Sequence, residues 1–395
     1  MKNLPWGNVS YLKNEEFYNR IDELNLLKSL LSTTNQGTPP AIMIPGIRGV
    51  GKTALLKKIK EELSEEYLVN YIDLTQTYSY QLEQYDEINL MQVFYKSWLD
   101  ACKEKGLNVL TERIKKIFKT NKIKLGKIVN FGGYFVPIPE TEIDKAEIMN
   151  LVLELPQTLY NSHQKDLKGF IMIIDEFQAF NDLGTKLDNF LWLFRSFIQN
   201  QKNVAYIFSG SLNSNDEIVD KLAGSKGAFG GRMLTLELNP FSKETVKKYL
   251  NERVPSLFFA DDGFDRFYEC TKGIPYYVNT FANMLPKDIK LDNEKVKNEF
   301  LVVLPLLADH LKLQWGGLNS TQQRILTTLI NQPIKRVAIA EKLGRSSNSL
   351  SIPLNQLVQM RLIENNNGVY KIAEPILKAW LKRKYQIKGV FPFRV

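Results

Sequence analysis

The sequence predicts an α/β protein that has a parallel-sheet core, a helical lid domain and a C-terminal winged helix-turn-helix. Three observations support this fold class. Apolar runs alternate with helical patterns up to residue 238, the pattern is all-helical from residue 239, and the final segment has the order helix, short helix, turn, longer helix and β-wing. We expect domains at 1–238, 239–315 and 316–395, with an insertion at about 75–168 in the first.

The core domain is predicted from apolar runs that show no polar alternation, as is typical of parallel strands covered on both faces. The expected strands are 41–45, 68–74, 170–174, 204–209 and 233–238. Helical spacing supplies the expected covering helices, at 52–68, 143–162 and 186–200. The insertion is mostly helical in pattern, and alternating apolar residues around Gly132 and Gly133 predict a hairpin within it.

A phosphate-binding loop follows the first expected strand. The stretch PGIRGVGKTALL, which begins at Pro45, fits G-x-x-x-x-G-K-[ST] and stands between a strand and a helix, as the motif requires. Glycines let backbone N–H groups approach a polyphosphate closely, while the motif lysine supplies a charge and the threonine a hydroxyl for Mg²⁺. The residues expected to bind ATP here are Gly46, Ile47, Arg48, Gly49, Val50, Gly51, Lys52, Thr53 and Ala54.

Acidic and hydroxyl residues end two other strands. In FIMIIDEFQAF, Asp175 and Glu176 directly follow an apolar run, and α/β sheets bind ligands at the carboxyl ends of their strands. Asp175 is expected to hold Mg²⁺ together with Thr53, and Glu176 to act as the general base toward water. In YIFSGSLNS, Ser209 or Ser211 would sense the γ-phosphate or position water; a plain turn is the alternative.

Positive charge is concentrated in the last fifth of the chain. The protein has a net charge of +9, yet residues 319–395 contain 13 basic and 3 acidic residues, a net charge of +10, while the rest contains 39 basic and 40 acidic residues. This asymmetry predicts an acidic partner, most simply DNA, with plain solubility as the alternative. We find no signal peptide and no membrane span, and the two cysteines and two histidines lie far apart, so we expect a cytoplasmic protein.

Taken together, these motifs resemble the archaeal-type P-loop ATPases, a branch close to the STAND and origin-recognition groups of AAA+-like enzymes. Three further segments are similar: FYNRIDELNLLKSLL from Phe17, GGRMLTLELNPFS, and KGIPYYVN. The resemblance implies a Mg²⁺-dependent ATPase, with Phe17 and Arg20 on the adenine side and Pro275 in the lid near the base. The expected catalytic residues are Glu176, Lys52 and Arg232. Arg232 is a candidate sensor or trans-acting finger, and a surface salt bridge is the alternative role for it.

The C-terminal segment predicts a recognition helix at 346–361. Ser347 and Asn348 would then meet base edges, and Arg345 and Arg361 would contact phosphates. Pro353 would either kink this helix or mark a later start. Because winged helices also dock proteins, a second hypothesis remains open: a STAND-like regulatory switch that hydrolyses ATP slowly and binds a protein partner or a second copy of itself.

Overall fold

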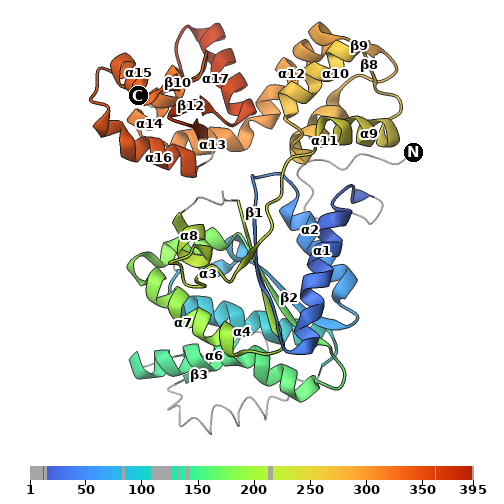
Figure 1. Ribbon diagram of the computed structural model, residues 1–395, viewed down its shortest axis with the longest axis vertical. Helices are drawn as coiled ribbons and strands as arrows, with labels where there is room; N and C mark the ends of the chain where they lie inside the picture. The colour runs from blue at the N-terminus through green and yellow to red at the C-terminus, as the bar shows by residue number, and fades with distance from the viewer. Residues whose placement is uncertain are drawn as a thin grey trace. The chain divides into compact units, whose positions relative to one another are not determined.

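The computed structural model describes residues 12, 16–81, 85–107, 127–131, 134–138, 142–211, 217–360 and 362–393 (Figure 1). The chain forms two compact units. The sheet unit contains Arg20–Pro45 and Lys52–Glu237, whereas the helical unit contains Gly46–Gly51 and Leu238–Val395 together with the residues before Arg20. The expected domains 239–315 and 316–395 both fall within the helical unit, so a boundary near 315 remains a prediction.

The sheet unit has a five-stranded parallel sheet in the order β2-β5-β6-β1-β7. Its strands are β1 (Ala41–Pro45), β2 (Tyr67–Asp73), β5 (Gly169–Asp175), β6 (Val204–Gly210) and β7 (Leu234–Thr235). Both β5 and β6 are buried along their whole length, as their unbroken apolar runs predict. The last strand is shorter than the expected 233–238, because its regular pairing with β1 covers Leu234 and Thr235 and is followed by an isolated bridge between Leu238 and Gly46.

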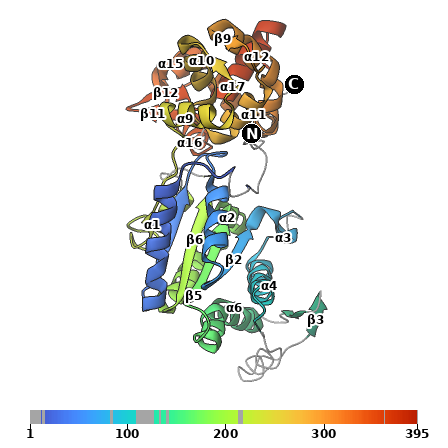
Figure 2. The same cartoon turned by 90° about the vertical axis from the view of Figure 1, so that its right-hand side faces the viewer.

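Helices cover both faces of this sheet (Figures 1 and 2). On one face lie α1 (Ile21–Ser32) and α2 (Lys52–Leu63). On the other lie α4 (Glu87–Glu104), α6 (Glu142–His163) and α7 (Leu187–Asn200), with α8 (Glu217–Ala223) following β6. α2 ends five residues before the predicted limit, since the chain turns at residues 64–66 to enter β2.

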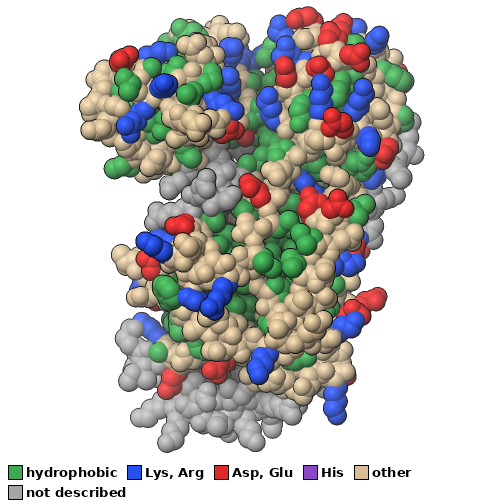
Figure 3. Space-filling view, in the orientation of Figure 1, with side chains coloured by type: hydrophobic (Ala, Val, Ile, Leu, Met, Phe, Trp, Pro, Cys, Tyr) green, Lys and Arg blue, Asp and Glu red, His purple; other side chains and the backbone are tan. Residues whose placement is uncertain are grey.

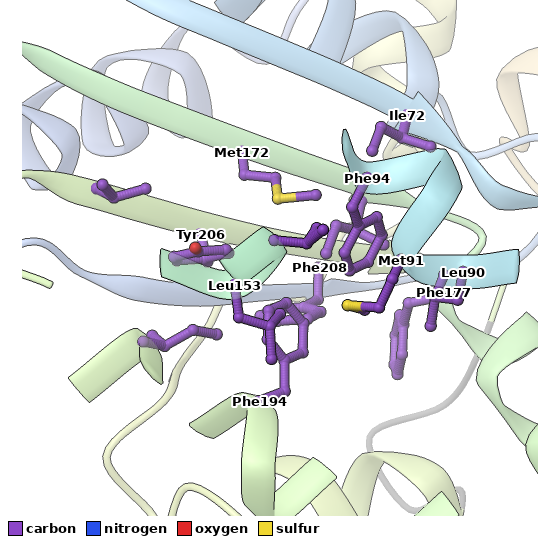
Figure 4. Packing of buried hydrophobic residues seen from close by; sticks show 14 of the residues in the cluster. Ile72, Leu90, Met91, Phe94, Leu153, Met172, Phe177, Phe194, Tyr206 and Phe208 are labelled. Atoms are coloured by element: carbon purple, nitrogen blue, oxygen red, sulfur yellow. The ribbon is translucent and has the colours of Figure 1, made fainter. Parts of the chain in front are cut away.

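The largest core lies between the sheet and the second helical layer (Figure 4). Alternate residues of the strands, such as Met172, Tyr206 and Phe208, point from the sheet into this layer, and Phe94 of α4 and Phe194 of α7 pack near them. Aromatic side chains bury large apolar areas, so this cluster contributes much of the packing between the sheet and its second helical layer.

The predicted insertion between β2 and β5 is present. Two short segments, η3 (Leu74–Gln76) and α3 (Tyr78–Gln81), come first, and α4 and α6 then pack against each other. The predicted hairpin is confirmed as an antiparallel pair of β3 (Lys127–Phe131) and β4 (Tyr134–Ile138). After β5 the chain continues through η4 (Phe177–Lys186) into α7.

The helical unit contains a row of helices with a single apolar core. Its first helices are α9 (Lys243–Arg253), α10 (Asp261–Thr271), α11 (Pro275–Met284), α12 (Asn293–Leu307) and α13 (Asp309–Gly317), with β8 (Phe258–Phe259) paired to β9 (Lys290–Leu291). Asp292 caps α12 by accepting from the Lys295 amide. The sequence analysis did not foresee α13.

The C-terminal segment contains the predicted succession of helix, short helix, longer helix and β-strands, with β10 as an element that was not predicted. Its elements are α14 (Ser320–Thr328), β10 (Ile334–Lys335), α15 (Arg336–Leu343), α16 (Ser351–Gln359), β11 (Ile363–Asn366), β12 (Val369–Ile372) and α17 (Pro375–Lys388). The three strands form one antiparallel sheet in the order β10-β12-β11. Asn319 caps α14, and Asn319 and Gln322 form a capping box.

The prediction of a single helix over 346–361 is wrong at the start of that range. A short 3₁₀ segment, η5 (Asn348–Leu350), precedes α16, and Pro353 is the third residue of α16. Proline is tolerated in the first turn because its missing N–H has no partner in the helix there. Pro353 therefore marks a later start. Within the described residues, no helix is both long and apolar enough to cross a membrane.

Candidate nucleotide-binding site

Polar residues gather at the carboxyl edge of the parallel sheet. β2 and β5 end in register, with Asp73 opposite Asp175, and β6 ends beside them at Gly210. α2 begins at Lys52, directly after the phosphate loop. Within the sheet unit, Thr53 contacts Asp175 and Lys52 contacts Ser211. The start of α2 therefore lies at the same edge of the sheet as the ends of β5 and β6, although these segments are far apart in sequence.

Asp175 is fully buried and accepts three hydrogen bonds. Its Oδ2 accepts from the Thr53 hydroxyl at 2.8 Å and from the Tyr71 phenol at 2.9 Å, and its Oδ1 accepts from the Glu176 amide at 3.0 Å. Burial and the charge of Asp175 raise the pKa of Tyr71, so its phenol stays protonated as a donor. These donors stabilise a carboxylate that would be costly to bury alone.

The Thr53–Asp175 pair fits a magnesium ion. Mg²⁺ prefers oxygen ligands at about 2.0–2.1 Å in an octahedron, so adjacent ligand oxygens lie roughly 2.9 Å apart. The hydroxyl and carboxylate oxygens of this pair are 2.8 Å apart. The described residues contain no cluster of three or more His, Cys, Asp or Glu that could bind a metal by themselves. A cation here would therefore need further oxygens, which the phosphates of a bound nucleotide and water supply.

Glu176 occupies a strained and oriented position. Its backbone is left-handed, with φ 54°, a conformation that costs a non-glycine residue roughly 1–2 kcal/mol. Its carboxylate accepts from the Gln178 side-chain amide and, at a long 3.4 Å, from the Ser211 hydroxyl. Ser211 in turn accepts from the Lys52 ammonium at 3.3 Å. Strain of this kind concentrates at functional sites, and here Ser211 links the strained carboxylate to the Lys52 ammonium.

The phosphate loop, Gly46–Gly51, packs within the helical unit. Gly49 and Gly51 have φ +80° and +102°, so both use the left-handed freedom of glycine. The Gly49 carbonyl accepts from the Tyr276 amide at 3.1 Å, and a Cβ at Gly49 would lie 2.7 Å from the Tyr276 Cβ. The loop and the start of α11 therefore touch backbone to backbone.

The next residue of α11 reaches the C-terminal segment. The Tyr277 hydroxyl donates to the Glu374 carboxylate at 3.0 Å, and the same oxygen accepts from the Ile376 amide at 3.0 Å to cap α17. Burial raises the pKa of Glu374 to about 6, against the opposing effect of these two donors. Two adjacent tyrosines thus connect the phosphate loop to the helix that carries much of the basic tail.

The residues expected near the adenine differ in how deeply they are buried. Phe17 is half-buried, and Pro275 is half-buried at the first position of α11. Arg20 is buried and pairs with Glu23 at 2.8 Å. The sequence analysis overlooked Tyr18, whose ring lies 4.7 Å from that of Tyr249 in the helical unit.

Among the described residues, two predicted site residues form no hydrogen bond with the acidic pair. Ser209 directly follows Phe208, which pairs with Ile174 of β5, but its hydroxyl is buried in β6 without a hydrogen-bond partner, whereas Ser211 donates to Glu176. Arg232 is exposed and precedes β7, which runs parallel to β1 with Leu234 opposite Ile42. Arg232 is therefore on the side of the amino ends of the strands, away from the edge that holds Asp175. A role in trans remains a prediction for it.

The predicted DNA contacts differ in exposure. Arg345 and Asn348 are exposed, but the Ser347 hydroxyl is buried without a partner in the described part of the chain, so it does not face solvent as a base contact requires. Arg361 is outside the described residues. Exposed basic side chains of the segment include Lys335, Lys342, Lys382 and Lys388, and Figure 3 shows Lys and Arg side chains scattered over its visible face.

Sequence reasoning missed Tyr71 and Gln178, which contact the acidic pair within the sheet unit, and Tyr276, which contacts the phosphate loop within the helical unit. A signal existed for the first, because LVNYIDL combines apolar residues with polar ones toward the end of the strand. Gln178 follows the acidic pair by two residues, and only its hydrogen bond to Glu176 reveals its role. Tyr276 contributes through its backbone, which no pattern of side chains could indicate.

Comparison with known proteins adds independent information. The chain matches a solved Walker-type ATPase of Pyrococcus abyssi with a TM-score of 0.62, at 19% identity over 94% of this chain and 97% of that one. This likeness shows the fold. Cdc6p of Pyrobaculum aerophilum aligns over 94% of each chain at 16% identity with a TM-score of 0.42, from which nothing is inferred.

No curated protein sequence matches the chain significantly. A family model does match, however, and it covers residues 17–281, which is most of the chain and includes the phosphate loop, Asp175 and Glu176. The model describes an ATPase domain found predominantly in Archaea. The chain therefore belongs to this family of P-loop ATPases.

Proposed function

We propose that this protein binds and hydrolyses ATP with Mg²⁺, and that its nucleotide state controls a C-terminal winged helix that binds DNA. The observation that carries the catalytic part is the Thr53–Asp175 pair beside Glu176 at the carboxyl edge of the sheet. A structural role alone would not require a strained glutamate there.

The residues have separable tasks in this proposal. Backbone N–H groups of the loop and the Lys52 ammonium bind the phosphates, and Thr53 and Asp175 hold Mg²⁺, which neutralises charge on the phosphates when bound. Glu176 accepts a proton from the attacking water, while Gln178 and Ser211 keep its carboxylate oriented. Ser211 is placed to respond to the γ-phosphate because it already accepts from Lys52.

Control of the C-terminal segment is supported by the contacts within the helical unit. A shift of the loop at Gly49 would move the Tyr276 backbone, and Tyr277 would carry that movement to Glu374 and α17. The DNA assignment rests on the basic excess of residues 319–395 and on the exposed Arg345.

A protein partner is the second candidate for this segment, and one observation favours it. Ile352 and Val337, on α16 and α15, are 72% and 58% exposed. Ile352 belongs to the helix expected to read DNA, and exposed apolar side chains are more typical of a protein-docking surface than of a DNA-binding one.

Hydrolysis is tested by phosphate release from ATP. Glu176→Gln should reduce turnover by about 100-fold or more while leaving ATP binding in place, because general-base catalysis contributes roughly 10²–10⁴. Glu65→Gln, an exposed acid of the same unit, is the matched control. Equal turnover in the two variants would refute the role of Glu176.

DNA binding is tested by fluorescence anisotropy of a labelled duplex, without nucleotide, with ADP, and with ATP and Mg²⁺ in the Glu176→Gln protein. We expect binding that depends on nucleotide and weakens steeply between about 50 and about 200 mM salt, because phosphate contacts release counterions. Arg345→Gln should reduce the salt slope by about one. Absence of binding in every state would favour the protein partner.

A further inference from the structure

A pocket of about 610 Å³ opens in the sheet unit beside the acidic pair. It is lined by Thr75, Tyr80, Gln81, Tyr85 and Asp182, which come from η3, α3, the segment ahead of α4, and η4. None of them is assigned to nucleotide binding above. The pocket nevertheless adjoins the site, because Thr75 donates to Asp73, the register partner of Asp175, and the charge of Glu176 contributes to raising the pKa of Tyr80.

The chemistry of the pocket is that of a site for a cation. Asp182 forms no hydrogen bond or ion pair within the described residues, and burial raises the pKa of its carboxyl group. Lys186, in the same segment, is already paired with Glu87 at 2.9 Å. The Tyr85 hydroxyl is buried and has no hydrogen-bond partner in the described part of the chain. The pocket therefore offers a carboxylate and an unsatisfied hydroxyl, and none of its described lining residues is positively charged.

Two aromatic rings complete the surface. Tyr80 and Tyr85 meet edge to face, with centroids 5.7 Å apart. A phosphate or nucleic acid would be repelled by Asp182, and an apolar group would leave the Tyr85 hydroxyl unsatisfied. A guanidinium group suits the carboxylate, the hydroxyl and the aromatic rings together. It pairs with a carboxylate, donates several hydrogen bonds in a plane and stacks on an aromatic ring.

We propose that this pocket binds an arginine side chain of a partner polypeptide. Asp182 would pair with the guanidinium, the Tyr85 hydroxyl would accept from it, and one of the two rings, which stand nearly perpendicular to each other, would stack on its planar face. Asp182 and Glu176 belong to one continuous segment, since Glu176 immediately precedes η4. An occupied pocket would thus act on the strained backbone of Glu176, a consequence that depends on the ATPase proposal, whereas the binding itself does not.

The test is anisotropy of a fluorescein-labelled peptide of alternating arginine and glycine, measured without nucleotide on the full chain. A peptide with citrulline in place of arginine has nearly the same shape without the charge. We expect the arginine peptide to bind the wild-type protein about tenfold or more tightly than the citrulline peptide, since charged hydrogen bonds contribute most of the affinity.

Asp182→Asn should weaken arginine-peptide binding by about fivefold or more, and Tyr85→Phe by roughly two- to fivefold. Asp166→Asn, an exposed aspartate of the same unit outside the pocket, should leave binding unchanged. Near-ultraviolet circular dichroism checks that each variant folds. Equal binding of the two peptides, equal effects of the two aspartate variants, or no binding of the arginine peptide would each overturn the proposal. Because no nucleotide is present, any of these results leaves the ATPase proposal standing.

Discussion

The carboxyl group of Glu374 should make the stability of the helical unit depend on pH. Burial raises its pKa from 4.5 to about 6, although the Ile376 amide and the Tyr277 hydroxyl both donate to it. A raised folded-state pKa means that the fold disfavours the ionised form. The cost is absent below pH 4.5, grows as the pH rises through 6, and is complete above that. At about 1.36 kcal/mol per pH unit, it reaches at most about 2 kcal/mol.

Glu374→Gln isolates this effect. Glutamine keeps a side-chain oxygen that accepts from Ile376 and Tyr277 but cannot ionise. We expect the variant and the wild-type protein to be equally stable near pH 4.5, and the variant to be more stable by up to about 2 kcal/mol at pH 8. The measurement is urea unfolding at pH 4.5, 6 and 8, followed by tryptophan fluorescence, to which Trp315 and Trp380 of this unit contribute.

Glu364→Gln is the matched control, because Glu364 forms an exposed pair with Lys371 at 2.8 Å and exposed pairs contribute little to stability. Its pH profile should follow that of the wild-type protein. A stability difference between Glu374→Gln and wild type that stays constant from pH 4.5 to 8 would refute the assignment of a raised pKa to this carboxyl group.

Two further predictions concern the phosphate loop and its acidic partner. Gly49→Ala should weaken binding of a fluorescent ATP analogue by about tenfold or more, because its Cβ would meet the Tyr276 Cβ at 2.7 Å in a left-handed backbone. Gly344→Ala is the control, because Gly344 has φ +62° with open space around it. It should lower the stability of the protein without changing its affinity for the ATP analogue, and a loss of affinity in this variant would contradict the role given to the Gly49–Tyr276 contact. Thr53→Ala should raise the Mg²⁺ concentration needed for turnover while Thr53→Ser should not, and similar magnesium curves would remove the pair with Asp175 from the metal site.

Much of the sheet and its edge could be predicted from local patterns. The apolar runs predicted β5 and β6 because a fully buried strand has no polar alternation, and the acidic pair was expected at the end of β5 for the same reason. The start of α16 was less certain from sequence, since Pro353 is compatible with either a kink or a first turn. Only the backbone settled that the helix begins at Ser351.

The sequence by itself determined the fold class, the phosphate-binding motif and the acids Asp175 and Glu176, because each depends on neighbours along the chain. Tertiary structure alone decided which distant residues join them. Tyr71 reaches Asp175 because β2 and β5 pair in register, and Ser211 reaches Lys52 because β6 ends at the same edge. The contact of Tyr277 with Glu374, 97 residues away, likewise depends on how helices pack. Such contacts follow from strand order and helix packing, which no local pattern of residues encodes.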